Sequence, residues 1–398
     1  MTMDSARLDA DGIQPLATKV AESSPAAEER AASSRSRLEC LDALRGIAAS
    51  VVFFQHAFSM FPLPASGTLP GTLFRIESRV FSGAAAVDLF FVLSGFVLTL
   101  PYVGQRAKQM DYTDFIVRRV TRLYPAYWIA VAAALASRLL FGDQLHASAL
   151  TEWTAKHWTA PLTLSEVLRT LAMVLPMDDL ALNTVFWTLL VEMQVSLLLP
   201  FFIVVFAAAT GVRGTLLLFI ACVVITATMA EHSGLQFLPL FALGIALAKY
   251  QAKIITALGT LARKWSVALL LLSLVLIEVR VFVPWRFPDL RPDYISGVGA
   301  GLLIMLVLAW PRLSRGLVNP VTRLLGTASY SLYLLHLPIL LAVVPPLYAY
   351  TGSVLACVAG GFALSLIVAQ GVYRLIELPC QESGRQFAKR VAGWTSAR

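Results

Sequence analysis

Residues 41–61 read LDALRGIAASVVFFQHAFSMF, an apolar run long enough to cross a lipid bilayer that nevertheless contains Arg45 and His56. The two are eleven positions apart, which is about 20° more than three full helical turns, so they share one helix face. At about 1.5 Å of rise per residue they lie about 16 Å apart, one near a membrane edge and one well inside. An ionisable residue is costly at such depth, so its presence there favours a functional role. The structural alternative is an anchoring Arg and a His bonded to a neighbouring helix.

The composition is that of a membrane protein. Of the 398 residues, 58% are hydrophobic and 14% are charged, and the mean hydropathy is +0.72. A soluble domain could not bury this much apolar surface. Runs long enough for a hydrocarbon core of about 30 Å predict an all-α, polytopic protein with about ten transmembrane helices. The predicted spans are residues 41–61, 83–103, 124–141, 187–209, 214–230, 235–250, 266–282, 294–310, 327–345 and 353–373.

The basic residues predict the orientation of these spans. With both termini in the cytoplasm, 24 of the 32 Lys and Arg residues fall on the cytoplasmic side, as the positive-inside rule requires. The net charge of +8 then reflects short loops beside an anionic membrane surface. We therefore expect membrane lipid as a partner and no nucleic acid.

The ends of the chain differ from its middle. Residues 1–37 are rich in Ala, Ser and mixed charge, which predicts a disordered cytoplasmic tail. The expected membrane domain covers residues 38–379, and residues 380–398 form a basic cytoplasmic tail. The four cysteines have neither paired nor metal-binding spacing, so we expect no metal.

Two further predicted spans carry a carboxylate, Asp88 and Glu192. An unpaired carboxylate inside a membrane is costly, which favours a function for both. In the predicted topology both lie at the depth of His56, about 7 Å below the outer surface. A base and two acids at one level form a candidate catalytic site. His336, by contrast, is explained equally well by function or by bonding to backbone near Pro338.

Two other segments suggest binding surfaces. Arg119 and Arg122 are three residues apart, so on a helix they present a two-guanidinium fork that suits phosphates, although ordinary positive-inside charge explains them as well. The long outer loop, residues 142–186, contains an amphipathic run at 164–175 that is compatible with an interfacial lid. Its histidines are interpreted as ordinary loop residues.

Five blocks occur along the chain in a fixed order. They are LDALRGIAASVVFFQH, VDLFFVLSGFVLT, RRVTRLYPAYW, WTLLVEMQVSLLLP, and LGTASYSLYLLHLPI followed by RLIELP. In these blocks the chain resembles the integral membrane acyltransferase-3 family of bacterial O-acyltransferases. The resemblance implies that Arg45 and His56 are the catalytic pair, that Arg119 and Arg122 are the family's paired arginines, and that Glu192 is the acid of the tryptophan block. That block usually ends Glu-Glu or Glu-Gln, whereas here Met193 follows Glu192.

The resemblance also implies an activity, the transfer of an acyl group from cytoplasmic acyl-CoA, with acetyl-CoA expected, to an acceptor hydroxyl. We predict an O-acyltransferase of the bacterial inner membrane that acts on a surface or exported carbohydrate, with a macrolide or lipid as the alternative acceptor. Partner proteins of a polysaccharide pathway are expected. Some family members carry a C-terminal hydrolase-like domain. This chain extends about 19 residues past Pro379, so it is expected to act alone or with a separate partner.

The expected chemistry leaves alternatives open. A neutral His56 can deprotonate a hydroxyl if a carboxylate fixes its tautomer, or it can carry the acyl group itself. The competing class is a transporter, because buried His, Asp and Glu also form proton relays. A transporter of that kind predicts inverted repeats with broken helices, which the sequence does not display. A non-catalytic sensor would not need the cytoplasmic arginines.

Overall fold

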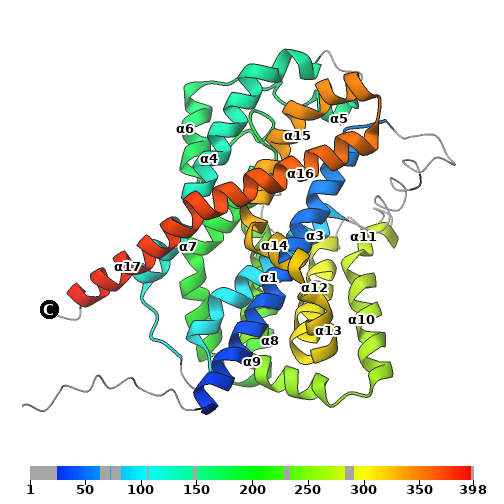
Figure 1. Ribbon diagram of the computed structural model, residues 1–398. Helices are drawn as coiled ribbons and strands as arrows, with labels where there is room; N and C mark the ends of the chain where they lie inside the picture. Colours follow the sequence, from blue (N-terminus) through cyan, green and yellow to red (C-terminus); the bar gives the residue numbers. More distant parts are fainter. Residues whose placement is uncertain are drawn as a thin grey trace, which may run out of the picture. The chain divides into compact units, whose positions relative to one another are not determined.

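The computed structural model describes residues 25–62, 72, 82–104, 107–146, 150–227, 234–282 and 291–395 (Figure 1). In these ranges all regular structure is helical. The helices are α1 (Pro25–Ser59), α3 (Gly83–Thr99), η1 (Leu100–Tyr102), α4 (Tyr112–His146), α5 (Glu152–Ala155), α6 (Leu164–Ala172), α7 (Phe186–Ala208), α8 (Gly211–Ala227), η2 (Gly234–Phe237), α9 (Leu238–Gly259), α10 (Arg263–Ile277), α11 (Val279–Phe282), α12 (Pro292–Ala309), α13 (Pro311–Leu317), α14 (Pro320–Thr327), α15 (Ser329–Thr351), α16 (Val354–Val372), η3 (Tyr373–Glu377) and α17 (Leu378–Thr395). The chain divides into Met1–Leu38 and Glu39–Arg398, and all contacts described below lie within the second unit.

Every predicted span coincides with a helix, which confirms the all-α fold. Among the described residues, seven helices are long and apolar enough to cross a membrane. The apolar helix α8 is shorter, with 17 residues, and α10 has 15. The chain is therefore a polytopic membrane protein, while the count of ten crossings and the cytoplasmic termini stay predictions.

The predicted tails are described only in part. Residues 1–24 lie outside the described residues, and α1 begins at Pro25, inside the segment for which disorder is predicted. At the other end, α17 extends through most of the predicted basic tail. The domain boundaries at residues 37 and 379 stay predictions.

Close helix packing positions α3. A Cβ atom on Gly95 would lie 2.2 Å from the carbonyl oxygen of Phe241, and one on Gly244 would lie 2.3 Å from that of Val92. These glycines let the backbones of α3 and α9 touch, as small residues do between membrane helices. Ser94, the residue before Gly95 on α3, lines a cavity in the protein.

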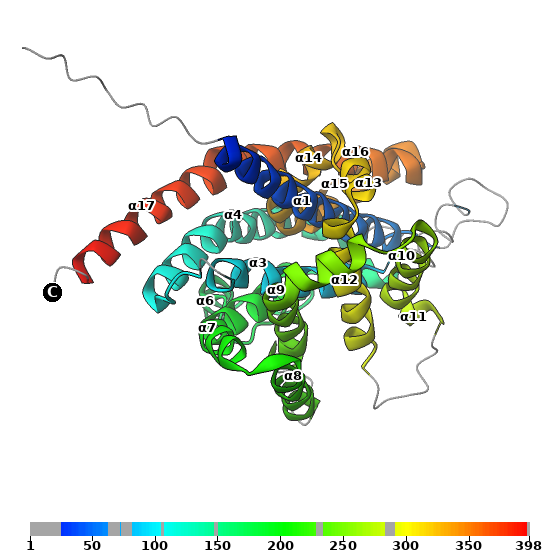
Figure 2. The ribbon, with the colours of Figure 1, turned by 90° about the horizontal axis from the view of Figure 1, so that it is seen from below.

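The segment between α4 and α7 is fastened to α4. The last carbonyl groups of a helix have no partner within that helix. At the end of α6, backbone carbonyl oxygens accept hydrogen bonds from three α4 side chains. The Tyr124 hydroxyl donates to the carbonyl of Ala172 at 2.6 Å, the Tyr127 hydroxyl to that of Thr170 at 2.7 Å, and the Trp128 indole to that of Leu171 at 3.1 Å. The aromatic residues of the RLYPAYW block therefore hold α6 in place. Figure 2 shows α15 and α16 on another side of α4, where α15 packs against it.

Candidate active site

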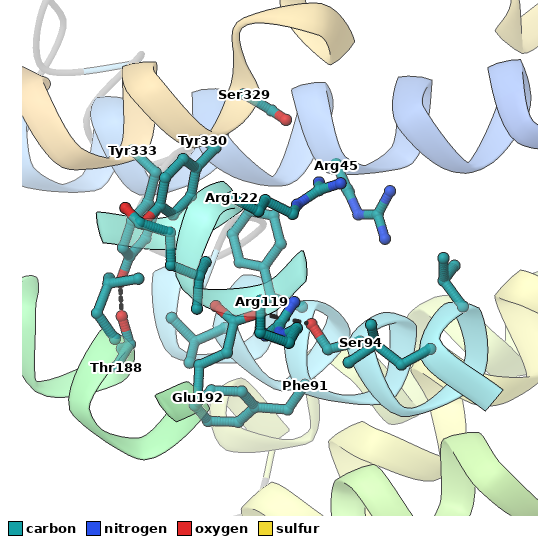
Figure 3. A pocket seen from close by; sticks show the side chains of 16 residues that line it. Arg45, Phe91, Ser94, Arg119, Arg122, Thr188, Glu192, Ser329, Tyr330 and Tyr333 are labelled. Atoms are coloured by element: carbon teal, nitrogen blue, oxygen red, sulfur yellow. Dashed lines mark hydrogen bonds and ion pairs between the residues drawn. The ribbon is translucent and has the colours of Figure 1, made fainter. Parts of the chain in front are cut away.

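A cavity of about 110 Å³ lies between α1, α3, α4, α7 and α15. We call it the arginine cavity, because Arg45, Arg119 and Arg122 line it (Figure 3). Its other polar lining residues are Ser94, Thr188, Glu192, Ser329, Tyr330 and Tyr333. Five separate helices contribute, so the cavity exists only when the helices are packed together.

Glu192 is held firmly in the arginine cavity. Its carboxylate accepts from Arg119 Nη2 at 2.6 Å and from Ser94 Oγ at 3.1 Å. The Nε of Arg119 donates to Ser196 at 3.1 Å, and the Arg119 side chain is only 5% exposed. The predicted arginine fork is therefore divided, because Arg119 is engaged by Glu192 while Arg122 has no ion-pair partner among the described residues.

The arginine cavity has an excess of positive charge. Among its described lining residues the carboxylate is that of Glu192, which is paired with Arg119. Arg45 Nη1 lies 2.9 Å from the carboxylate of Asp42, which does not line the cavity. Figure 3 shows the side chains of Arg45 and Arg122 entering the cavity from α1 and α4. A buried site with surplus guanidinium groups favours an anionic ligand.

A second hollow, of about 230 Å³, contains His56 and is here called the histidine cavity. Its lining includes Trp153, His157 and Tyr333. The Trp153 ring lies against His56, with ring centroids 5.5 Å apart and planes inclined by 24°. Val87 and Tyr333 line both cavities, so the two cavities adjoin at these side chains.

His336 bonds to His56, and its own surroundings fix the proton positions. His336 Nδ1 lies 3.1 Å from the carbonyl oxygen of Leu332, which can only accept, so this nitrogen carries the hydrogen. In a neutral imidazole the other nitrogen is then an acceptor. His336 Nε2 lies 2.8 Å from His56 Nδ1, so His56 donates through Nδ1. The lone pair of neutral His56 is consequently on Nε2.

Pro338 does not explain His336. A proline removes the hydrogen bond to the carbonyl four residues earlier, here that of Leu334. That oxygen instead accepts from the side-chain amide of Asn183 at 3.0 Å. His336 is therefore not needed to satisfy the interrupted turn, and its Nε2 remains available to His56.

His157 follows α5 and lies outside the candidate membrane spans. Its Nδ1 bonds the carbonyl oxygen of Trp153 at 2.9 Å, and its ring contacts the Trp153 ring edge-on at 4.5 Å. Burial lowers the pKa of His157, so this imidazole is neutral near pH 7. It holds the Trp153 ring that covers His56.

Asp88 lines neither the arginine cavity nor the histidine cavity. Its fully buried carboxylate accepts from Arg280 Nη1 at 2.9 Å, and the same guanidinium also pairs with Asp293. The grouping of Asp88, Glu192 and His56 expected from their depth is therefore not formed, because two of its members are paired with different arginines. The expected carboxylate partner of His56 is replaced by His336.

Sequence reasoning left out three residues of the site. The sequence favours function and structure equally for His336, predicts an ordinary loop residue at His157 and indicates no role for Tyr333. An ionisable residue inside an apolar span was a usable signal for His336. The sequence carried no comparable signal for His157 or Tyr333, because their neighbours come from distant segments.

The family described as Acyltransferase domain matches residues 38–373. The chain belongs to the acyltransferase-3 family. That match contains both histidines of the pair, all three arginines of the arginine cavity and Glu192, so the two cavities lie in the part that the family shares.

Curated relatives agree with this assignment. The chain is 25% identical over 340 residues to YrhL, a candidate peptidoglycan O-acetyltransferase of Bacillus subtilis (strain 168), covering 78% of this chain and 52% of that protein. It is 39% identical over 57 residues to the exopolysaccharide production protein ExoZ of Rhizobium meliloti (strain 1021), covering 14% of this chain and 17% of ExoZ. The chain thus spans about half the length of YrhL and less of ExoZ. No solved structure matches.

Proposed function

We propose that this acyltransferase-3 protein moves an acyl group from acyl-CoA to a hydroxyl of a surface or exported carbohydrate. The acyl group that we expect is acetyl. The observation that carries the proposal is the His56–His336 pair, which leaves the lone pair of His56 on Nε2 with no hydrogen-bond partner among the described residues, in a cavity next to the arginine-lined one. The relatives named for peptidoglycan and exopolysaccharide support a carbohydrate acceptor.

The arginine cavity suits the donor. Acyl-CoA carries phosphates at one end and a thioester at the end of a flexible arm. Arg122, which has no ion-pair partner among the described residues, is the group we assign to a donor phosphate, and Arg45 holds the arm in register. Arg119 has the separate task of fixing Glu192.

The proposed reaction takes place where the two cavities meet, at Val87 and Tyr333. His56 Nε2 accepts the proton of the acceptor hydroxyl while the oxygen of that hydroxyl attacks the thioester carbonyl carbon. The carbon–sulfur bond breaks, and the departing thiolate takes the proton back from His56. His336 accepts from His56 Nδ1 throughout, which stabilises the transient imidazolium and keeps the ring oriented.

The histidine cavity suits a sugar. Trp153 and Trp187 supply aromatic faces, and Lys156 and Thr184 supply polar groups around His56. Aromatic rings beside hydrogen-bonding groups are suited to the apolar faces and hydroxyls of carbohydrates. A macrolide or a lipid hydroxyl is the alternative acceptor.

Two measurements test this function. Purified protein in lipid vesicles is expected to consume acetyl-CoA when an acceptor is supplied, and the His56→Ala variant is not. Deleting the gene and comparing acetyl esters by mass spectrometry then identifies the acceptor. Loss of ester from a secreted small molecule or a lipid, with every glycan unchanged, would reject the carbohydrate and keep the enzyme. Unchanged esters in all fractions, with no thioester consumption, would reject acyl transfer.

A further inference from the structure

A third hollow, of about 190 Å³, lies between α4 and the C-terminal helix α17, and we call it the α4–α17 cleft. Its charged and aromatic lining residues are Tyr102, Phe115, Arg118, Arg119, Arg122 and Arg385. We propose that this cleft binds the phosphorylated nucleotide end of the acyl donor and that Arg385 contacts its phosphates. The inference rests on the function proposed above.

The position of Arg385 is set by close packing. A Cβ atom on the preceding residue, Gly384, would lie 2.0 Å from the hydroxyl oxygen of Thr121 on α4. Only glycine lets α17 approach α4 this closely. The next residue is thus held at the edge of the cleft.

A buried network fixes the start of α17. Glu377, which is only 3% exposed, accepts from Ser331 on α15 at 2.9 Å and from Gln381 on α17 at 3.1 Å. Gln381 itself lines the cleft. Figure 1 shows α17 continuing the line of α16 after the π-helical turn η3. The helix is therefore anchored to the bundle at its start, through Glu377, and at Gly384, beside Arg385.

The charge of the cleft favours polyanions. Four of its lining side chains are arginines, and its described lining includes no carboxylate. Asp114 engages Arg118 at 2.8 Å and Glu192 engages Arg119. Arg122 and Arg385 have no ion-pair partner among the described residues, so two guanidiniums remain for a ligand with several phosphates.

The cleft and the arginine cavity are neighbours. Arg119, Arg122, Val97 and Leu98 line both. A ligand with phosphates in the cleft can therefore extend an arm past Arg122 into the arginine cavity. The rings of Tyr102 and Phe115, whose centroids lie 6.4 Å apart, offer apolar faces for a nucleotide base. The arginines of the cleft thus match the phosphates, the two aromatic rings match the base, and the arginine cavity matches the thioester arm.

This use of α17 goes beyond the family assignment. The family match ends at residue 373, whereas Gln381 and Arg385 lie after it. The C-terminal helix of this chain therefore supplies part of the donor site.

The test compares Arg385→Gln with Arg374→Gln, a matched loss of one exposed arginine that does not line the cleft. Binding of coenzyme A and of 3′,5′-ADP is measured on full-length protein in lipid nanodiscs at several salt concentrations. We expect about tenfold weaker binding of both probes for Arg385→Gln, with a smaller salt dependence, and wild-type binding for Arg374→Gln. Elution volume and unfolding temperature confirm that both variants fold.

A truncated donor makes the test specific. S-acetylpantetheine lacks the nucleotide and its phosphates, so wild type and Arg385→Gln are expected to use it equally well. Equal coenzyme A affinity in wild type, Arg385→Gln and Arg374→Gln would overturn the inference and leave the proposed function standing. Failure of the wild-type protein to bind coenzyme A at all would overturn the donor assignment together with this inference.

Discussion

His56 Nδ1 on α1 and His336 Nε2 on α15 lie 2.8 Å apart, although the two residues are 280 positions apart in the sequence. The planes of the two rings are inclined by only 10°. Because the Leu332 carbonyl fixes the hydrogen of His336 on Nδ1, the lone pair of His56 is on Nε2, which has no hydrogen-bond partner among the described residues. One neutral imidazole thereby orients another, a task that catalytic sites often give to a carboxylate.

Removing the base is the first test. The His56→Ala variant is expected to lose acyl transfer by about 100-fold or more, since a positioned base contributes at least that much. Steady-state thioester consumption in lipid vesicles measures the loss. Coenzyme A binding should persist, because His56 does not line the arginine cavity. Normal turnover in this variant would contradict the assignment.

Removing the acceptor on His336 is the second test. His336→Leu is expected to lower kcat about tenfold, because a hydrogen bond to an imidazolium contributes about 1.5 kcal/mol. His336→Gln retains an acceptor oxygen and should recover most of the activity, with both KM values unchanged. Equal kcat values in the Leu and Gln variants would show that His336 serves packing alone.

The two arginines of the predicted fork are expected to behave differently. Arg122→Ala should weaken coenzyme A binding and reduce its salt dependence, because Arg122 has no ion-pair partner among the described residues. It should leave the unfolding temperature nearly unchanged. Titration of coenzyme A at several salt concentrations, beside a thermal scan, measures both. If coenzyme A affinity and its salt dependence are unaltered, Arg122 does not bind the donor and is explained by the positive-inside rule alone.

Glu192 is expected to carry stability as well as function. Glu192→Ala leaves the buried Arg119 without its counter-ion, which costs about 3 kcal/mol or more. The double variant Arg119→Met/Glu192→Leu should recover much of that loss, because no buried charge remains. Chemical unfolding in detergent measures all three proteins. A double variant as unstable as the sum of the single variants would contradict this coupling.

His157 makes stability depend on pH. Burial lowers its pKa in the folded protein, so below the unfolded value of about 6.5 the unfolded chain binds more protons. Its contribution to stability is present above that pH and is lost as the pH falls. The unfolding temperature of wild type should therefore decrease from pH 7 to pH 5 more steeply than that of His157→Gln. Parallel slopes would exclude the effect.

Helix positions were predictable because they depend on local properties. Each apolar run is long enough for a membrane span, and every predicted span coincides with a helix. Arg45 and Glu192 were also found from sequence, since charged residues inside apolar runs are conspicuous, and Arg119 and Arg122 were found from their three-residue spacing. All four line one cavity.

Pairings between helices were not predictable in this way. Depth along separate helices predicted that Asp88 lies with His56. In the packed protein, however, Asp88 on α3 forms an ion pair with Arg280 on α11. Depth states how far a residue lies from the membrane surface and leaves open which helix it faces.

The sequence by itself determined that this is an α-helical membrane protein of the acyltransferase-3 family, because apolar length, charge and ordered motifs are written along the chain. Only the tertiary structure decided that His336 orients His56, that Glu192 engages one arginine of the fork, and that Arg385 joins α4 at a common cleft. The physical reason is that hydrogen bonds and ion pairs act over a few ångströms. Their partners are therefore set by which helices pack together, and residues hundreds of positions apart become neighbours.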